Sequence, residues 1–459
     1  MKLSSRTTGL LGLLLFLSLS LQAQDTTAVV NWLKKQAKPL RTVEPGTANQ
    51  DLAPVGKAIG QCRIVAMGEA THGTRDFFRM KHRVFEYLVQ HKGFTVFGME
   101  APFTEGVKLN EYIRNGTGDP VAIIHTMYWC WETEEVLDLV QWMRAYNLDS
   151  KHQHKLSFLG FDPQGAISEG FPELQTYFRR VNPAYVAYCQ QLDTLVNSQV
   201  KKLRSEQEQQ KQEARRNRDV VQPRLQAVLD TLQRNRVSYT ARSSREEWEI
   251  AEQTMKGILR AYTNAFLPNQ GAQEQARDLG MLENVRWMLE QQGPRSKALL
   301  WAHNSHVNSD STYRPPFIPE GSPTPRRLGT NLRKAYPKDC YIIGFEFNQG
   351  DFQINFLTPG NRPSLQKLTL NAAPAGTLAH TLAQVRIPLY FVVLDQRNKQ
   401  PEAVRQWLTS PQKAHQYGGG MSPSAPRSFE QIRLTNSYDA LIFVDTTHRA
   451  VPLPVTSAR

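Results

Sequence analysis

Seven short, almost uninterrupted apolar runs recur along the chain, separated by longer segments with helical periodicity. Strands that are buried on both faces of a sheet have this pattern. Helices between the runs supply the crossovers that parallel strands need. The runs are Arg63–Met67, Phe94–Met99, Leu156–Phe161, Lys297–Ala302, Cys340–Phe345, Leu389–Leu394 and Ala440–Val444. The pattern therefore predicts an α/β fold with a mostly parallel central sheet covered by helices.

One long stretch departs from this alternation. Residues 171–256 contain no glycine and are rich in Gln, Glu, Lys and Arg, with Pro223 within them. Proline suits the first turn of a helix, so we expect two long helices, over roughly 183–220 and 223–267. They would form a long helical hairpin inserted into the α/β domain, over 171–267. Its mixed charges indicate a solvated face, and a lid or partner-binding arm is the alternative.

The N-terminus has the pattern of an export signal. Lys2 and Arg6 precede the apolar run that opens with Gly9–Leu17, and Ala23 offers a small residue for cleavage. This predicts a signal peptide over 1–23 and a mature domain over 24–459, exported to the periplasm or secreted. The apolar run is short for a membrane span. We therefore expect no stable membrane insertion after cleavage, with an uncleaved anchor as the alternative.

Charge and cysteine content change this picture little. The net charge of +13 is compatible with anionic partners, but it is spread along the chain and accompanies no nucleic-acid-binding module. We therefore expect no nucleic acid partner. The four cysteines form no Cys-x-x-Cys pair, so a zinc–thiolate or redox site is not indicated. Buried thiols or one or two disulfides fit equally, and the sequence leaves the oligomeric state open.

The first apolar run leads into Gly68–Thr74, which places Glu69 three residues before His72. In open α/β folds, functional groups gather where strands end. The flanking glycines allow a tight turn and close approach to a ligand. A helix should follow, with Thr74 as its N-cap and its free N–H groups directed at the turn.

Other strand ends carry the same residue types. Each of the next four runs is followed by an acid or histidines, and parallel strands would bring them to one sheet edge. These residues are Glu100, Asp162, His303, His306 and Glu346. Trp129 and Trp131 stand before a predicted helix, where they either face a ligand or join the core. We expect the acids and histidines to converge on one cleft.

The available chemistry is carboxylate plus imidazole. The sequence has no Gly-x-Ser-x-Gly elbow, no His-Glu-x-x-His helix and no cysteine in a nucleophile context. A histidine could take a proton from water while a carboxylate orients its ring. The same side chains could instead bind zinc or manganese. Both interpretations stay open on the residues alone.

The motifs Gly68–Phe78, Phe97–Glu100, Leu159–Gln164, Arg277–Asn284, Trp301–His306 and Tyr438–Asp445 resemble the erythromycin esterase family. The resemblance implies a metal-independent hydrolase that opens macrolide lactone rings, built on an α/β core with an added helical part. It implies His72 as general base, Glu69 and Glu100 as carboxylate supports, and His303 and His306 as further polar site members. Lys81 stands where characterised members carry an arginine, which bears on the identity of the substrate.

These observations predict an exported hydrolase of a small-molecule carboxylic ester or macrolactone that uses no cofactor. The expected catalytic residues are His72, Glu69, Glu100, His303 and His306. The expected substrate-binding residues are Lys81, Arg75, Trp129, Trp131 and Asp162. A metal-dependent hydrolase of peptides or phosphoesters, built on the same Glu/His set, is the first alternative. A non-catalytic ligand-binding protein is the second.

Overall fold

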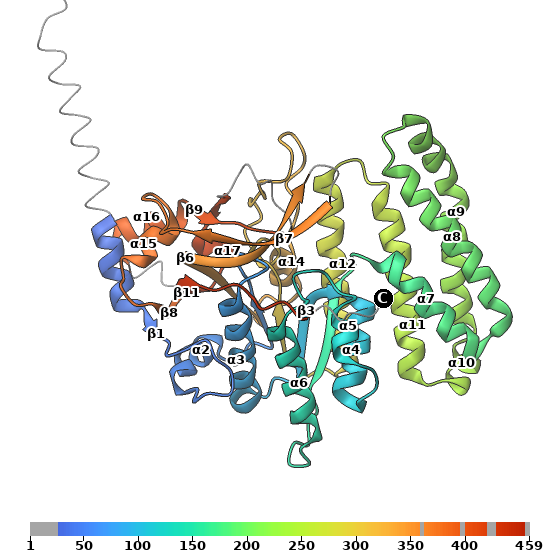
Figure 1. The fold of residues 1–459 in the computed structure, drawn as a ribbon, viewed down its shortest axis with the longest axis horizontal. Coiled ribbons are helices and arrows are strands. Elements are labelled where there is room, and N and C mark those ends of the chain that lie inside the picture. The colour runs from blue at the N-terminus through green and yellow to red at the C-terminus, as the bar shows by residue number, and fades with distance from the viewer. Residues whose placement is uncertain (1–25, 359–361, 395–399, 420–427, 455–459) are drawn as a thin grey trace, which may run out of the picture. The chain divides into compact units, whose positions relative to one another are not determined.

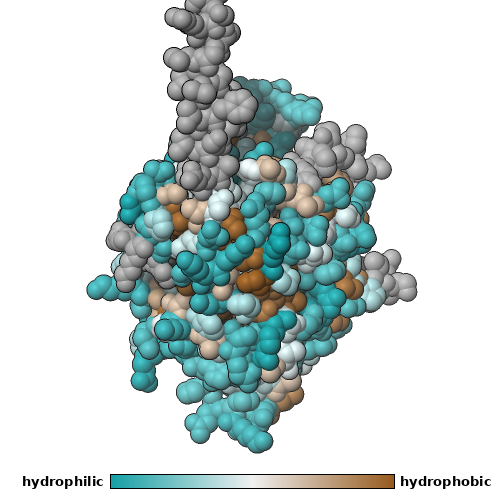
Figure 2. Space-filling model, turned by 90° about the vertical axis from the view of Figure 1, so that its left-hand side faces the viewer, coloured by the Kyte–Doolittle hydropathy of each residue, from teal (hydrophilic) through white to brown (hydrophobic). Residues whose placement is uncertain are grey.

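The computed structural model describes residues 26–358, 362–394, 400–419 and 428–454 (Figure 1). The expected signal peptide lies outside these ranges. No helix within them is long and apolar enough to cross a membrane. The face drawn in Figure 2 is largely hydrophilic, with small hydrophobic patches among the polar residues, and scattered exposed apolar residues are normal on a folded protein. The four cysteines are present as thiols, three of them buried and Cys62 half-buried.

The α/β fold predicted from the apolar runs is confirmed, since each run contains a strand of a mixed, mostly parallel sheet. Nine strands belong to this sheet within the described residues: β1 (Lys38–Pro39), β2 (Ile64–Met67), β3 (Val96–Pro102), β4 (Ser157–Asp162), β5 (Ala298–Trp301), β6 (Cys340–Thr358), β7 (Arg362–Leu370), β8 (Leu389–Val393) and β11 (Ala440–Thr447). Two further strands, β9 (Pro411–His415) and β10 (Phe429–Arg433), pair antiparallel with each other.

The chain divides into two compact units. Of the described residues, the first comprises those up to Gly93, Ala302–Tyr313 and those between Lys338 and Val451, and the second comprises Phe94–Trp301, Arg314–Pro337 and those from Pro452 onward. In the first unit the strand order is β1-β8-β11-β6-β2. Strands β2 and β11 run parallel to β6, whereas β8 is antiparallel to β11 and β7 is antiparallel to β6. The apolar run of β8 looks like the others because burial on both faces does not depend on strand direction.

Helices of the first unit follow or flank these strands. A helix over 26–36 precedes β1. The others are η1 (Gln50–Leu52), α2 (Ala53–Ile59), α3 (Arg75–Lys92), α13 (Asn304–Val307), α15 (Leu378–Ala383), α16 (Glu402–Thr409) and α17 (Leu434–Ser437). Helix α3 starts after Thr74, as expected, and ends where Gly93 adopts a left-handed conformation with φ of 69°. Its apolar residues Phe77, Met80, Val84, Tyr87 and Leu88 are buried, which fixes the helix against the core and sets the orientation of its first turns.

In the second unit, β3 lies between β5 and β4, and all three strands are parallel. The helices around them are α4 (Phe103–Asn115), α5 (Pro120–Ile124), α6 (Glu134–Leu148), α7 (Ala166–Val181), α12 (Gln270–Gln291) and α14 (Leu328–Ala335). Helices α4 and α12 pack on β4. The apolar runs of β3, β4 and β5 are buried along their length, as the sequence pattern predicts for covered parallel strands.

The expected helical insertion is present, but Pro223 does not divide it into two helices. After η2 (Pro183–Tyr185) it contains α8 (Val186–Leu203), α9 (Glu208–Arg234), α10 (Arg236–Arg242) and α11 (Arg245–Ala265). Figure 1 shows α7 to α11 lying side by side. Helix α9 continues through Pro223 because buried Val221 and Leu225, on either side of the proline, pack into the core shared by these helices. That packing offsets the lost backbone hydrogen bond.

Candidate active site

The turn between β2 and α3 is held by close backbone approaches. A Cβ on Gly68 would lie 2.1 Å from Oδ1 of Asn304, and a Cβ on Gly73 would lie 2.0 Å from the carbonyl oxygen of Gln353. Neither glycine has a positive φ among the residues described. The two glycines are therefore required for contact with α13 and β6, whereas the sequence suggested tight turning and approach to a ligand.

Within this turn, Glu69 joins a histidine and a lysine. Nδ1 of His72 donates to Oε1 of Glu69 at 2.8 Å, and Nζ of Lys81 donates to Oε2 at 2.7 Å. Glu69 and Lys81 are completely buried, and the side chain of His72 is 10% exposed. Since a carboxylate only accepts hydrogen bonds, Nδ1 carries a hydrogen and Nε2 is the nitrogen that can take a proton.

Lys81 reaches Glu69 through an aromatic enclosure. Its Nζ lies 4.9 Å from the ring centroid of Phe345, 5.9 Å from that of Phe77 and 6.0 Å from that of Phe78. A buried carboxylate is tolerated when it is paired and hydrogen-bonded, and aromatic faces also attract a cation. The buried position of Lys81 makes it a support of Glu69. Its predicted contact with substrate stays a prediction.

Helix α13 brings a second histidine to the turn. The ring centroids of His72 and His303 lie 4.9 Å apart, with the ring planes at 52°. His303 caps α13, because its Nδ1 accepts the backbone N–H of Ser305 at 3.1 Å. In the neutral ring this assigns the hydrogen to Nε2. The two imidazoles thus have opposite tautomers, one suited to accepting a proton and one to donating a hydrogen bond. His306 is also buried, on the same short helix.

Asn304, within the Trp301–His306 motif, holds this arrangement together by hydrogen bonds. Its backbone N–H donates to the carbonyl of Glu69 at 2.8 Å. Its side-chain amide donates to the carbonyl of Phe345 at 2.8 Å and accepts the N–H of the same residue at 3.1 Å. The pairing of β2 with β6 ends at Met67 and Ile343. Beyond it, Asn304 supplies hydrogen bonds that a neighbouring strand would otherwise provide.

We expect Asn304→Ala to lower the free energy of unfolding by about 1–3 kcal/mol, because it leaves buried backbone groups of β6 unpaired. Asn304→Asp keeps the oxygen that accepts the N–H of Phe345 and loses the amide donor. This one contact should therefore be weakened less in Asn304→Asp than in Asn304→Ala. Urea unfolding curves of the two variants and the wild type measure this. Equal stability of Asn304→Ala and wild type would contradict the role given to the amide.

A second acid–imidazole pair lies in the same unit. Nδ1 of His415 donates to Oε1 of Glu346 at 2.9 Å, and the backbone N–H of His415 donates to Oε2 at 3.1 Å. Glu346 was noted at its strand end, but His415 was missed because β9 has no apolar run. Burial raises the pKa of Tyr438 well above its ordinary value, and the carboxylates of Glu430 and Glu346 raise it further. The polar cluster of this unit thus extends beyond the turn.

The second unit holds its own charged cluster. Arg277 donates to Asp162 through Nε at 3.0 Å and Nη2 at 2.6 Å, and Nη2 also donates to Glu100 at 3.1 Å. Burial lowers the pKa of Arg277, but the carboxylates of Asp162 and Glu100 outweigh this and raise it well above its ordinary value. Burial raises the pKa of Tyr128, and Asp162 adds to this rise. Two predicted site carboxylates therefore share one guanidinium. In the sequence, Arg277 was noted only as part of the Arg277–Asn284 motif.

The other predicted site residues have identifiable surroundings. Trp131 is fully buried, donates from Nε1 to the carbonyl of Glu100 at 2.8 Å and packs edge-on against Trp301. These contacts favour a core role. Trp129 is half-buried. Nη2 of Arg75 lies 3.5 Å from Oε1 of Glu44, in a partly exposed ion pair. Their proposed contacts with substrate stay predictions.

Some of the residues that we expected in one cleft lie together within each unit. Glu69, His72, Lys81 and His303 gather in the first, and Glu100, Asp162 and Arg277 gather in the second.

Two N–H groups near the start of α3 already have backbone partners: that of Arg75 donates to the carbonyl of His448 at 2.9 Å and that of Phe78 to the carbonyl of Thr74 at 3.2 Å. Among the described residues, no group of three or more His, Cys, Asp or Glu side chains is positioned to hold a metal ion.

A sequence model of erythromycin esterases matches residues 89–447. The chain belongs to the erythromycin esterase family. Its matched part contains Glu100, Asp162, His303 and His306 and begins after the turn that carries Glu69 and His72. The predicted family is thereby confirmed, and the protein is a hydrolase of this family.

Individual proteins and solved structures are similar to this chain. The chain is 24% identical to erythromycin esterase type II of Escherichia coli over 340 residues, which cover 70% of this chain and 77% of that protein. A crystal structure of a Bacillus cereus protein, 25% identical, matches with a TM-score of 0.75 over 94% of this chain and 99% of that one. A mutant of the erythromycin esterase EreC in its open conformation matches with a TM-score of 0.64 at 16% identity, over 91% and 100% of the two chains. The last similarity bears on the fold alone.

Proposed function

We propose that the mature protein is an exported hydrolase of a carboxylic ester or macrolactone, in which Glu69 and His72 activate water without a metal. The observation that carries the proposal is the hydrogen bond from Nδ1 of His72 to Glu69 at 2.8 Å, with the other carboxylate oxygen held by Lys81 at 2.7 Å. This geometry leaves Nε2 as the basic nitrogen and places a fixed negative charge behind the ring, as general-base catalysis requires.

In the proposed reaction, Nε2 of His72 takes a proton from water as the water oxygen bonds to the ester carbonyl carbon. Glu69 stabilises the resulting imidazolium, and Lys81 balances the charge of Glu69. The tautomer of His303 presents an N–H that can stabilise the developing oxyanion. The intermediate then breaks its carbon–oxygen ester bond as the imidazolium protonates the leaving alkoxide. The products are a carboxylic acid and an alcohol, which in a lactone are parts of one opened ring.

Export and substrate identity rest on different supports. The pattern of residues 1–23 supports a cleaved signal peptide. The E. coli relative is named for erythromycin hydrolysis, which makes macrolactones the first substrates to try. The family resemblance places Lys81 where characterised members carry an arginine, and a lysine lacks the planar fork of that side chain. Because Lys81 contacts Glu69, this exchange bears on the support of the catalytic carboxylate as well as on the substrate.

The test is hydrolysis of a panel of macrolactones and simple carboxylic esters by mature protein, followed by mass spectrometry. We expect at least one panel member to gain the mass of one water, at a rate that a metal chelator leaves unchanged. Loss of activity in chelator, restored by zinc or manganese, would overturn the metal-free mechanism. An inactive protein across the whole panel, despite saturable binding of a panel member, would favour the non-catalytic alternative.

A further inference from the structure

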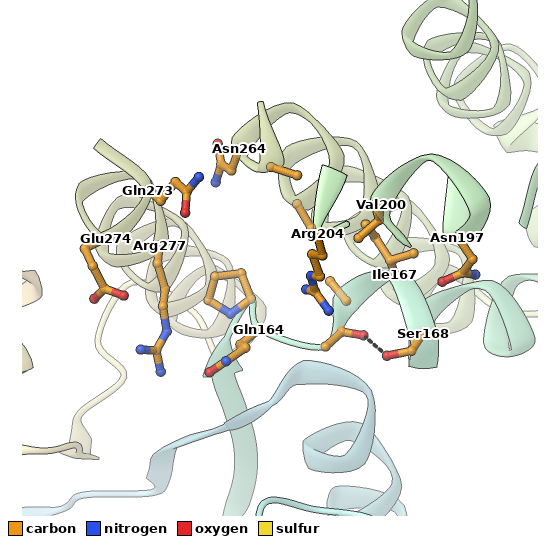
Figure 3. Close-up of a pocket in the computed structure, with 15 residues that line it drawn as sticks. Gln164, Ile167, Ser168, Asn197, Val200, Arg204, Asn264, Gln273, Glu274 and Arg277 are labelled. Carbon is orange, nitrogen blue, oxygen red and sulfur yellow. Dashed lines mark hydrogen bonds between the residues drawn. The ribbon is translucent and has the colours of Figure 1, made fainter. Parts of the chain in front are cut away.

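A cavity of about 360 Å³ lies in the second unit, between the loop after β4 and the helices α8, α11 and α12, with Arg277 of the charged cluster in its wall (Figure 3). This volume falls in the range of small-molecule sites. Gln164 and Ser168 come from the loop and the start of α7, Arg204 from the end of α8 and Asn264 from α11. Figure 3 shows the side chain of Arg204 extending toward the loop. None of the sequence-predicted site residues lines this cavity.

Uncommitted polar groups mark the walls of the cavity. Within the described residues, the side chains of Gln164, Asn264 and Arg204 make no hydrogen bond or ion pair. Asn197 also lines the wall and keeps its carbonyl oxygen uncommitted, since only its Nδ2 donates, to Asp193. A side-chain amide both donates and accepts hydrogen bonds. Several such amides around one space are suited to hydroxyl groups, which also donate and accept.

The charges around the cavity favour a neutral occupant. Of its three charged lining residues, Arg277 is paired with Asp162 and Glu100. Glu274 accepts from Nη1 of Arg327 at 3.1 Å. Behind the wall, Arg277 sets one positive charge against the two negative charges of its carboxylates, and Arg204 adds one positive charge, so the surroundings favour neither an anion nor a cation. Arg204 can still serve as a hydrogen-bond donor to a neutral oxygen.

The cavity also has an apolar wall. Ile167, Val200 and Ala261 also line it. Sugar rings present C–H faces as well as hydroxyl edges, so they need both kinds of surface. We propose that this cavity binds a neutral, polyhydroxylated group such as a hexose ring. This proposal does not depend on the hydrolytic activity of Glu69 and His72.

Ligand-observed NMR of the mature protein with glucose, galactose, maltose and glucuronate tests the proposal. We expect saturable binding of at least one neutral sugar at millimolar concentration. Asn264→Ala should weaken that binding about 3- to 10-fold, as loss of a hydrogen bond commonly does. Ala261→Phe should abolish it by filling the space. The matched control is Arg224→Ala, on the exposed surface of α9, which should bind as the wild type does.

Circular dichroism establishes that each variant is folded, and His72→Ala separates this site from hydrolysis because it should bind the sugar normally. No saturable binding of any neutral sugar would overturn the proposal. So would binding that survives both Asn264→Ala and Ala261→Phe. Preferential binding of glucuronate, lost in Arg204→Gln, would also overturn it and assign the cavity to anions.

Discussion

Lys81→Met should lower the free energy of unfolding by about 3–5 kcal/mol, because it leaves the buried Glu69 carboxylate without its cation. Methionine keeps much of the apolar length that packs against Phe345, so lost volume contributes little. Chemical denaturation of the wild type and the variant measures the difference. Of all single changes considered, this one should have the largest effect on stability.

The double variant Lys81→Met/Glu69→Gln separates charge from packing. With the carboxylate neutralised, the double variant should be more stable than Lys81→Met alone, and the cycle should give a coupling energy between the two positions. If Lys81→Met costs under about 1 kcal/mol, as breaking an exposed ion pair does, then Glu69 does not depend on Lys81 for its charge balance.

Glu69→Gln should lower kcat about 10⁴-fold with little change in KM, by analogy with other carboxylate–imidazole pairs. Lys81 would donate to the new amide oxygen, and the amide NH₂ would then point at Nδ1 of His72. The imidazole would carry its hydrogen on Nε2, the nitrogen that must accept the proton. Steady-state kinetics on any ester the protein cleaves measures the change.

The matched control for Glu69→Gln is Glu44→Gln. Glu44 pairs with Arg75 and Arg79 on the surface of the same unit, with 41% of its side chain exposed. Its neutralisation should leave kcat and KM close to those of the wild type. A Glu69→Gln enzyme that loses affinity for substrate while keeping kcat would contradict the assigned role, because it would make Glu69 a binding group.

Much of the fold follows from local pattern. The apolar runs locate seven strands because burial on both faces leaves no polar positions to interrupt them. Strands β9 and β10 have no continuous apolar run: only the last two residues of β9 are buried, and β10 alternates between buried and more exposed positions. Their antiparallel pairing with each other could not be inferred from that pattern. The helix boundary predicted at Pro223 was wrong, since packing on both sides of the proline holds α9 together. Tertiary contacts of this kind have no signature at the proline itself.

The residue types of the candidate site could be predicted from the sequence, but the hydrogen bonds and ion pairs that join these residues could not. Strand-end position identified Glu69, His72 and His303, and the structure brings them together. The role of Lys81 as partner of Glu69 depends on the direction of α3, which residue spacing alone leaves open. Asn304 and His415 act through backbone groups and carboxylates distant in sequence. A lone sequence carries no local signal for such contacts.

The central claim is that His72 removes a proton from the attacking water. Its most direct test is the appearance of ring-opened product, one water heavier, from a lactone that the wild type cleaves, with His72→Ala assayed beside it. His448→Ala is the control, since this histidine has 63% of its side chain exposed in the same unit. We expect His448→Ala to act at the wild-type rate and folded His72→Ala to be slower by at least about 10²-fold. Ring opening by His72→Ala at the wild-type rate would contradict the mechanism.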